Sequence, residues 1–452
     1  MSKSARTLLV ATTCVLVLGV ASPAAAHGIG GRADLPVPLG YFLIGAGIVL
    51  VLSFIALAAL WKKPRFQDGP VSRSTGVTVG RRSSAVISVL GLSMLVLVIA
   101  AGLIGVQNGT RNVAPVMVWV VFWLVVPFVS ALVGNLYADL NPWRKLSGLL
   151  MAGSEERAHL LSRWGVLPAG AAFFAFTWLE LVWPDSSSPR TLAVAALVYT
   201  LYVLAMAAWA GPVTGLQVGE AFTTYNRLVS AISPLGRSGD GRVVWRGWLR
   251  ALSVVPRWRG LTVFVILMIG TVSYDGLSGT SWWRDLLGRA SGEIWAETLG
   301  MVVISGLIGA AYWGASWAAV ALTGESGLRA GAVAASFAHT LVPIALAYAV
   351  AHYFTLVLFE GQLLLSTISD PFGQGWDLFG TAGRDIQYWL SVEAVWYVQL
   401  VVILAGHVAG VVLAHDRALV EFSEKTAVRS QYAMLVLMVL LTSLGLTILA
   451  AG

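Results

Sequence analysis

The sequence predicts an all-α fold, a polytopic transmembrane helical bundle of about ten spans that follows a cleaved signal peptide. Hydrophobic residues make up 57% of the 452 residues, and the mean hydropathy is +0.79. Charged residues make up 11%, whereas soluble domains contain about 25%. Apolar runs of about 18 residues or more recur along the chain, and each can cross a hydrocarbon core of about 30 Å.

The first 26 residues have the three parts of a secretory signal peptide. Lys3 and Arg6 precede an apolar run at residues 8–20, and the small-residue stretch 24–26 (Ala-Ala-Ala) follows it. We expect cleavage after Ala26, so that residues 27–452 form a single integral membrane domain. A retained signal anchor is the alternative, and either form leaves the next segment outside the plasma membrane.

Ten apolar segments of the mature chain are candidate spans. The sixth is short, and its helix has room to extend back to residue 255 or forward to residue 277. Ten crossings from an outer N-terminus place the C-terminus outside as well. The segments are residues 40–61, 85–106, 114–136, 165–183, 191–210, 260–274, 300–323, 330–358, 389–414 and 432–451.

The basic residues support this orientation independently. Loops on the predicted cytoplasmic side carry 21 Lys and Arg residues, against six on the outer side. Such a bias sets orientation by the positive-inside rule. We therefore predict a multi-pass protein of the plasma membrane, surrounded by the lipid bilayer, with both the mature N-terminus and the C-terminus outside.

The longest inner segment, residues 211–259, carries apolar side chains at helical spacing, at Phe222, Tyr225, Val229 and Ile232. This spacing predicts an amphipathic helix in the membrane interface. Two short motifs, 141–144 (Asn-Pro-Trp-Arg) and 219–222 (Gly-Glu-Ala-Phe), are interpreted as packed interfacial turns.

Composition and motifs exclude several function classes. The net charge of +7 does not indicate nucleic-acid binding, because the basic residues lie in short loops with no basic, aromatic-interleaved stretch. Cys14, the only cysteine, lies in the signal peptide, so the mature protein has no disulfide, iron–sulfur cluster or cysteine nucleophile. Walker, GxSxG and HExxH motifs are absent from the sequence. We expect a small-molecule or ion substrate, and the sequence indicates no particular protein partner.

Histidines inside the spans are candidate site residues, because an ionisable side chain at the membrane centre costs about 2.5–3.5 kcal/mol. His339 and His352 lie in the eighth span and His407 in the ninth. At about 1.5 Å per residue, His339 lies roughly 13 Å and His407 roughly 10 Å from the inner surface. We predict that these two imidazoles approach each other. Pro343 leaves the carbonyl of His339 without its helical donor, which suits a ligand site, although a kinked packing helix is the alternative.

Haem is a further alternative for His339 and His407. Four-helix b-type cytochromes often use histidines 13 or 14 residues apart on one helix, and His339 and His352 are 13 apart. At 100° per residue these two lie about 140° apart around the helix, so they do not share a face. Copper or zinc is therefore favoured over haem.

A second cluster is predicted at the outer surface. Cleavage after Ala26 would give His27 a free α-amine beside its imidazole, a pair of nitrogens that chelates copper. An incidental N-terminal histidine is the alternative. His27 and His352 share this level with four carboxylates that are candidate copper or zinc ligands, or ordinary interfacial charges. The carboxylates are Glu180, Asp275, Glu360 and Glu393.

Six stretches carry a family resemblance: residues 27–38 (HGIGGRADLPVP), 141–144 (NPWR), 339–343 (HTLVP), 351–353 (AHY), 406–407 (GH) and 414–417 (AHDR). In them the chain resembles a group of bacterial polytopic membrane proteins labelled fenitrothion hydrolase-like. The resemblance spans most of the chain. The label implies hydrolysis of an organophosphate triester.

Two classes of function remain open. One is a metal-dependent membrane hydrolase, in which histidines and outer carboxylates hold a metal that activates water or is redox-active. The other is a transporter, in which His339, Pro343 and His407 form a midplane substrate or proton site. A bound metal in the purified protein would favour the first class, and substrate flux without turnover the second.

Overall fold

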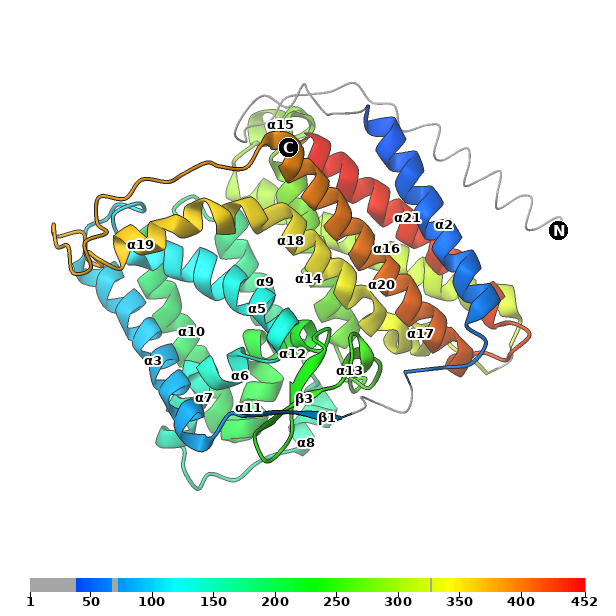
Figure 1. Ribbon diagram of the computed structural model, residues 1–452, viewed down its shortest axis with the longest axis horizontal. Coiled ribbons are helices and arrows are strands. Elements are labelled where there is room, and N and C mark those ends of the chain that lie inside the picture. The colour runs from blue at the N-terminus through cyan, green and yellow to red at the C-terminus, as the bar shows by residue number, and fades with distance from the viewer. Residues whose placement is uncertain (1–37, 67–71, 326, 452) are drawn as a thin grey trace. The chain divides into compact units, whose positions relative to one another are not determined.

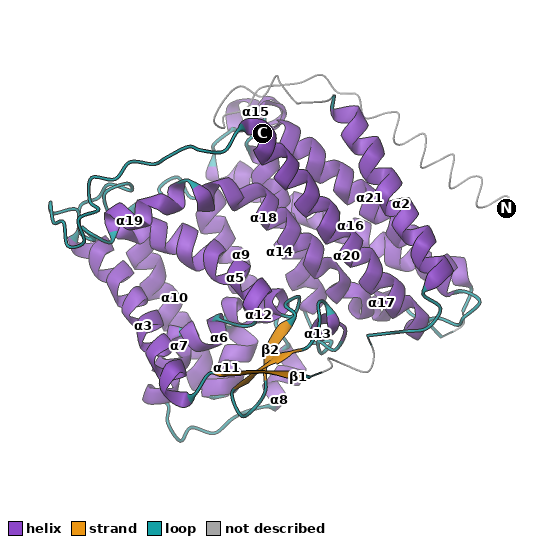
Figure 2. Ribbon diagram, viewed as in Figure 1, coloured by secondary structure: helices purple, strands orange, loops and turns teal. Residues whose placement is uncertain are grey.

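A computed structural model of the chain describes residues 38–66, 72–325 and 327–451. Helices dominate these residues, and one small antiparallel sheet is the exception (Figure 2). The predicted all-α fold class, a polytopic helical bundle, is confirmed. The signal peptide and its cleavage site lie outside the described residues and stay predictions.

Nine helices of the described residues are long and apolar enough to cross a membrane. Each coincides with one of the predicted spans to within a few residues at most ends. They are α2 (Leu39–Leu60), α3 (Arg81–Ile104), α4 with η1 and α5 (Val113–Val133), α10 (Pro189–Ala210), α14 (Leu261–Ser278), α16 (Ile294–Thr323), α17 with η3 and α18 (Ala330–Leu358), α20 (Val392–Glu421) and α21 (Ala427–Ala451).

The predicted fourth span forms a shorter apolar helix, α9 (Leu167–Leu181), of 15 residues. At about 1.5 Å per residue this helix is about 22 Å long, less than a hydrocarbon core of about 30 Å. The positive φ of Gly165, 57°, turns the chain sharply just before the helix begins. The ten predicted spans therefore correspond to nine full-length helices and one short one.

Two of the spans change helix type along their length. In the third span, η1 (Val116–Val125) is a π-helix between α4 (Val113–Pro115) and α5 (Val126–Val133). In the eighth, a 3₁₀ stretch, η3 (Ala338–Leu341), separates α17 (Ala330–Phe337) from α18 (Val342–Leu358). Pro127 and Pro343 contribute because neither can donate the helical hydrogen bond. Such interruptions are frequent at functional sites.

The chain forms two compact units. Unit 1 consists of the described part of Met1–Arg65 with Ile269–His352 and Leu390–Gly452, and unit 2 consists of Phe66–Met268 with Tyr353–Trp389. In unit 1, α2, α16, α20 and α21 are neighbours (Figure 1). A Cβ atom on Gly406 would lie 2.8 Å from the carbonyl oxygen of Pro343, so glycine allows α20 to approach α18 closely.

In unit 2, α3 lies against α10 and against α6 (Tyr137–Leu140). Gly91 of α3 faces the backbone of Leu140, and a Cβ there would overlap the Leu140 carbonyl. α12 (Ala221–Ser230) lies against α5 and α9. Both its apolar side, with Phe222, and its polar side, with Asn226, are buried. The helix predicted in this segment is confirmed, but its predicted place in the membrane interface is wrong, because protein encloses it.

Loops predicted to share a side of the membrane lie together in unit 2. The sheet β1–β3–β2 joins the first inner loop to the third, with Arg73 opposite Trp245. At the opposite, predicted outer ends, the amide of Val106 donates to Phe372 and the indole of Trp119 donates to Ser186. The assignment of the first side to the cytoplasm stays a prediction from charge. The strands are β1 (Arg73–Thr78), β2 (Leu235–Arg237) and β3 (Arg242–Trp245).

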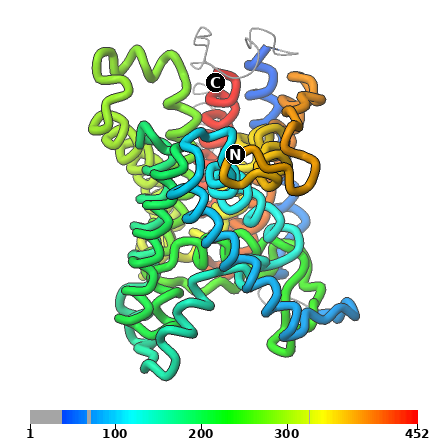
Figure 3. The backbone as a smooth tube through the Cα atoms, turned by 90° about the vertical axis from the view of Figure 1, so that its left-hand side faces the viewer, coloured from blue at the N-terminus to red at the C-terminus, as the bar shows by residue number. Residues whose placement is uncertain are grey.

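Short helices connect the spans, and residues 368–391 run without a helix or strand before α20 begins (orange in Figure 3). The connecting helices are α7 (Pro142–Leu150), α8 (His159–Trp164), α11 (Pro212–Gly219), α13 (Arg250–Ser253), α15 (Ser281–Leu287), η2 (Gly288–Ala290), η4 (Glu360–Gln362) and α19 (Leu363–Thr367).

Candidate functional site

Of the residues predicted to form a cluster at the outer surface, His352 and Asp275 lie close together in unit 1. Nε2 of His352, on α18, lies 2.8 Å from a carboxylate oxygen of Asp275, on α14. The two side chains are about a quarter exposed, at 27% and 22%. A paired imidazole and carboxylate of this kind can exchange a proton or stabilise each other's charge.

His407 is the most deeply buried of the predicted ligands. Its side chain is completely enclosed in unit 1, and Nδ1 lies 2.9 Å from the carbonyl oxygen of Ile403, one turn earlier on α20. Its ring meets that of Tyr348 edge to face at 5.9 Å. Nε2 has no hydrogen-bond partner among the described residues.

His339 lies in η3 and is 5% exposed. η3 contacts α20, the helix of His407, so the two segments are neighbours as predicted from their depth. Joint ligation by the two imidazoles stays a prediction. The expectation that Pro343 frees the His339 carbonyl is wrong, because the 3₁₀ turn lets the amide of Val342 donate to that carbonyl.

The remaining predicted carboxylates are distributed over both units. Glu393 is exposed near the start of α20 in unit 1, whereas Glu180 of α9 and Glu360 of η4 are half-buried in unit 2. His27 lies outside the described residues. Across the part of the chain that the structure describes, no three His, Cys, Asp or Glu side chains are grouped to hold a metal ion. Copper, zinc or haem binding stays a prediction.

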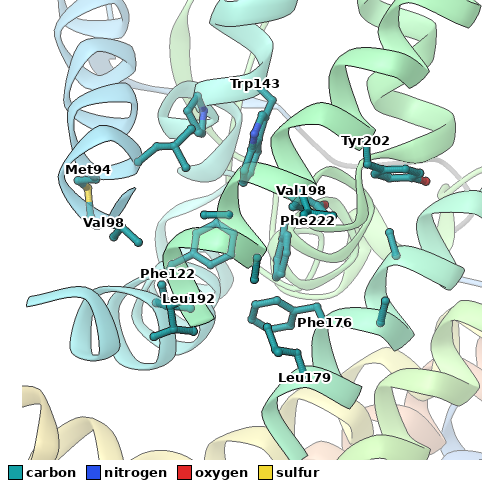
Figure 4. A pocket seen from close by; sticks show the side chains of 18 of the residues that line it. Met94, Val98, Phe122, Trp143, Phe176, Leu179, Leu192, Val198, Tyr202 and Phe222 are labelled. Carbon is teal, nitrogen blue, oxygen red and sulfur yellow. The ribbon is translucent and has the colours of Figure 1, made fainter. Parts of the chain in front are cut away.

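Unit 2 contains a cavity of about 710 Å³. Its wall is built from α3, η1, α6, α9, α10 and α12, together with the starts of α5 and α7 (Figure 4). Five alanines of α9 and α10 leave the space open, and aromatic side chains of η1, α6, α7, α9, α10 and α12 border it. The alanines are Ala171, Ala172, Ala175, Ala195 and Ala196.

Aromatic rings form a continuous network along this wall. The rings of Phe122 and Phe222 are 4.4 Å apart between centroids, and those of Phe176 and Phe222 are 4.8 Å apart. Trp143 and Tyr199 continue the network at 4.9 Å. The π-helix η1 contributes Phe122. Such edge-to-face packing holds large rings in fixed orientations.

A buried carboxylate lies directly behind the rings. Glu220, between α11 and α12, is 0% exposed. One carboxylate oxygen accepts from the hydroxyl of Tyr199 at 2.7 Å and the amide of Phe222 at 3.0 Å. The other accepts from Asn141 at 3.2 Å and from the amide and hydroxyl of Thr223 at 2.6 and 2.5 Å. Tyr199 and Phe222 also line the cavity.

This arrangement unites the two motifs interpreted as interfacial turns. Asn141 caps α7 through its side-chain oxygen, which accepts from the amides of Trp143 and Arg144, and its amide group donates to Glu220. Glu220 caps α12 in the same way. Two helix N-termini therefore meet at one carboxylate, and each end favours negative charge.

Burial raises the pKa of Glu220, and hydrogen bonds from Thr223, Tyr199 and the amides of Phe222 and Thr223 counteract that rise. Burial and the nearby Glu220 also raise the pKa of the Tyr137 phenol, which therefore stays protonated at neutral pH. Glu220 forms no ion pair within the described ranges. A fully buried carboxylate that lies beside a cavity and has a raised pKa is a candidate functional group.

Sequence reasoning did not identify Glu220 or the cavity. Glu220 lies in a loop between spans, within the motif 219–222 that was interpreted only as a packed turn. Glutamate is not among the residues that usually mark an N-cap, so the sequence carries no strong signal for its role.

The fold defines the class of this protein: it is a polytopic helical membrane protein with a cavity among the helices of unit 2. Comparison with protein-family models, with curated proteins and with solved structures found no match.

Proposed function

We propose that the protein is a membrane carrier for a small apolar molecule, which binds in the cavity of unit 2. The observation that supports this proposal is the cavity itself. Its volume of about 710 Å³ falls within the range of about 300–1,000 Å³ typical of small-molecule sites, and its wall is almost entirely apolar.

The residue types of the wall favour binding over bond cleavage. Among the described residues, those that line the cavity include no histidine, aspartate, glutamate, serine or lysine. Such side chains supply the nucleophiles, bases and metal ligands of hydrolases. A hydrolase of the kind that the family resemblance implies would place them against its substrate.

Interrupted helices beside the cavity support a carrier in particular. The π-helix η1 and the break between α11 and α12 both contribute to the wall or to the carboxylate behind it. Transporters commonly bind their substrates at discontinuous helices, where a small rearrangement changes access to the site.

Equilibrium binding of radiolabelled fenitrothion to the purified protein in nanodiscs tests the site. We expect displaceable binding without release of its nitrophenol. Ala195→Phe adds a ring to the cavity wall and should weaken binding about tenfold or more, because the apolar volume is filled. Ala205→Phe is the matched control, since Ala205 is exposed on the same helix away from the cavity.

Exchange measurements test the carrier step. Vesicles loaded with unlabelled compound should take up label faster when they contain the protein, and Ala195→Phe should remove that acceleration. Protein-dependent release of nitrophenol would replace the proposal with a hydrolase. Displaceable binding that Ala195→Phe leaves unchanged would show that the cavity is not the site.

A further inference from the structure

The charge behind the cavity wall selects among apolar ligands. Every group that contacts the Glu220 carboxylate is a hydrogen-bond donor: two backbone amides, two hydroxyls and the amide of Asn141. The Tyr199 hydroxyl already accepts from the amide of Ala221. Three of these groups, the two backbone amides and the Asn141 side-chain amide, can only donate, so the surroundings favour a carboxylate that accepts all five hydrogen bonds.

The aromatic residues that line the cavity also favour a positively charged ligand. The faces of aromatic rings carry partial negative charge, and the rings of Trp143, Tyr199, Tyr202 and Phe222 line the cavity. The hydroxyl of Tyr199 also donates to Glu220, and that of Tyr202 donates to the neighbouring carbonyl of Gly219. The described lining residues include no Lys, Arg or His that would offset the charge. The carboxylate is separated from the cavity by a single layer of side chains, in surroundings where water screens little.

We propose that the ligand of the cavity is a lipophilic organic cation, held by the aromatic rings and by the charge of Glu220. This inference rests on the proposed binding of apolar molecules in unit 2 and specifies their chemical class. The cation does not touch the carboxylate, whose oxygens stay bonded to their five donors. It gains from ring faces at contact distance and from an unpaired anion one residue layer away.

A proton competes with such a ligand. Protonation of Glu220 removes the negative charge, so cation affinity falls as the pH drops through the pKa of this group, which burial raises. The titratable side chains that face Glu220 are Tyr137 of α6 and Tyr199 and Tyr202 of α10. Glu180 of α9 acts on Tyr225, and Asp139 of α6 pairs with Arg237, so neither is the partner of Glu220.

Three probes of similar size and different charge test the proposal: tetraphenylphosphonium, tetraphenylborate and the neutral triphenylphosphine oxide. Their equilibrium binding is measured on the intact protein in nanodiscs of zwitterionic lipid. We expect the cation to bind about tenfold or more tightly than the neutral probe, and the borate to bind least. The affinity for tetraphenylphosphonium should decline in the mildly acidic range, at a pH above the ordinary pKa of glutamate, because burial raises the pKa of Glu220.

Two variants separate charge from structure. Glu220→Gln should remove the preference for the cation while the neutral probe still binds, and Glu220→Asp should retain the preference. Glu297→Gln is the matched control, because Glu297 in unit 1 accepts hydrogen bonds from Tyr274, Trp283 and Gly292. If Glu220→Gln fails to fold, the ranking of the three probes and the pH dependence of the wild type decide the question.

The outcomes distinguish the two proposals. Equal binding of all three probes in the wild type, sensitive to Ala195→Phe, would overturn the cation preference and leave the apolar site intact. A preference that survives in Glu220→Gln would remove Glu220 from the explanation. Absence of displaceable binding by any probe, including fenitrothion, would overturn the proposed function as well.

Discussion

His352 in unit 1 and Glu220 in unit 2 differ in the partners of their charged side chains. In unit 1, Asp275 faces His352, and His415 is engaged on both ring nitrogens, by Gln431 and by the carbonyl of Trp61. In unit 2, Glu220 has hydrogen-bond donors but no opposite charge, and it lies beside a large cavity. Unit 2 also contains an ion pair, between Asp139 and Arg237, so Glu220 is set apart by the large cavity beside a carboxylate that has hydrogen-bond donors but no cationic partner.

The difference shows where a buried charge is available to a ligand. A charge that is already paired gains little from a further partner, whereas an unpaired one attracts a ligand across a short, poorly screened distance. The histidines are more conspicuous in the sequence, but the described contacts of His352 and His415 hold helices together. Unit 2 has the space and the unpaired charge that binding needs.

The largest effect on stability is expected from Glu220→Ala. This change removes an N-cap and leaves two backbone amides and the hydroxyls of Tyr199 and Thr223 without their acceptor in a buried place, while Asn141 keeps its bond to Thr223. We expect a loss of about 2–4 kcal/mol, seen as a large drop in the apparent melting temperature of the detergent-solubilised protein. Glu393→Ala, at an exposed position of unit 1, is the control and should change stability by less than about 0.5 kcal/mol. Equal effects of the two variants would contradict the contrast between the units.

Gly91→Ala should be the next most damaging change. The added Cβ would overlap the backbone carbonyl of Leu140, and backbone cannot rotate away as a side chain can. Overpacking of this kind costs about 1–3 kcal/mol. The yield of monodisperse protein in size-exclusion chromatography measures the loss. Gly45→Ala in α2 of unit 1 has open space around the new Cβ and should behave as wild type.

Asp275→Asn should have a smaller effect, since the pair with His352 is partly exposed to solvent. Pairs of this kind contribute about 0.2–1 kcal/mol. A double-mutant cycle with His352→Gln, followed by melting temperature, isolates the interaction. A coupling energy well above about 1 kcal/mol would show that unit 1 also contains a strongly coupled charge site, and the two units would then differ less than we infer.

The smallest effect is expected from Glu156→Gln, and it should depend on pH. Burial raises the pKa of Glu156, but hydrogen bonds from the amides of Thr214 and Val213 lower it by more than burial raises it. The net pKa is therefore below the ordinary value. Because the folded pKa is lowered, this stabilisation is present above the unfolded pKa and is lost as the pH falls through the folded pKa. The melting temperatures of variant and wild type should therefore differ slightly at neutral pH and converge in acid. A difference that grows in acid would contradict this assignment.

The sequence was sufficient to predict the spans, because a membrane requires each spanning helix to have about 20 consecutive, mostly apolar residues. Residues 330–358, for example, were predicted as one span and are observed as Ala330–Leu358. The short helix α9 was also predicted as a full span, because its apolar content can be recognised in the sequence, whereas the residues at which a helix begins and ends are harder to predict.

The candidate site was not predictable in the same way. Asn141 and Glu220 lie 79 residues apart, and nothing in either motif indicates that one caps a helix while bonding to the other. The cavity results from small side chains on α9 and α10 facing rings from η1 and α12, which requires the three-dimensional packing. His339 and His407 stand out in the sequence because histidine is rare in membrane spans, yet its rarity does not specify what the imidazole contacts.

The sheet in unit 2 has a consequence for how the protein is made. β1 cannot find its partner β3 until the ribosome has passed Trp245, which pairs with Arg73. At about 5–20 residues per second, β1 waits on the order of ten seconds while several spans enter the membrane. Its six residues are all exposed and include an arginine, a serine and two threonines, so the waiting strand stays soluble. The last step in assembling these loops is thus timed by translation, and slowing the ribosome between the first span and residue 245 would prolong the interval in which unit 2 is open to proteolysis.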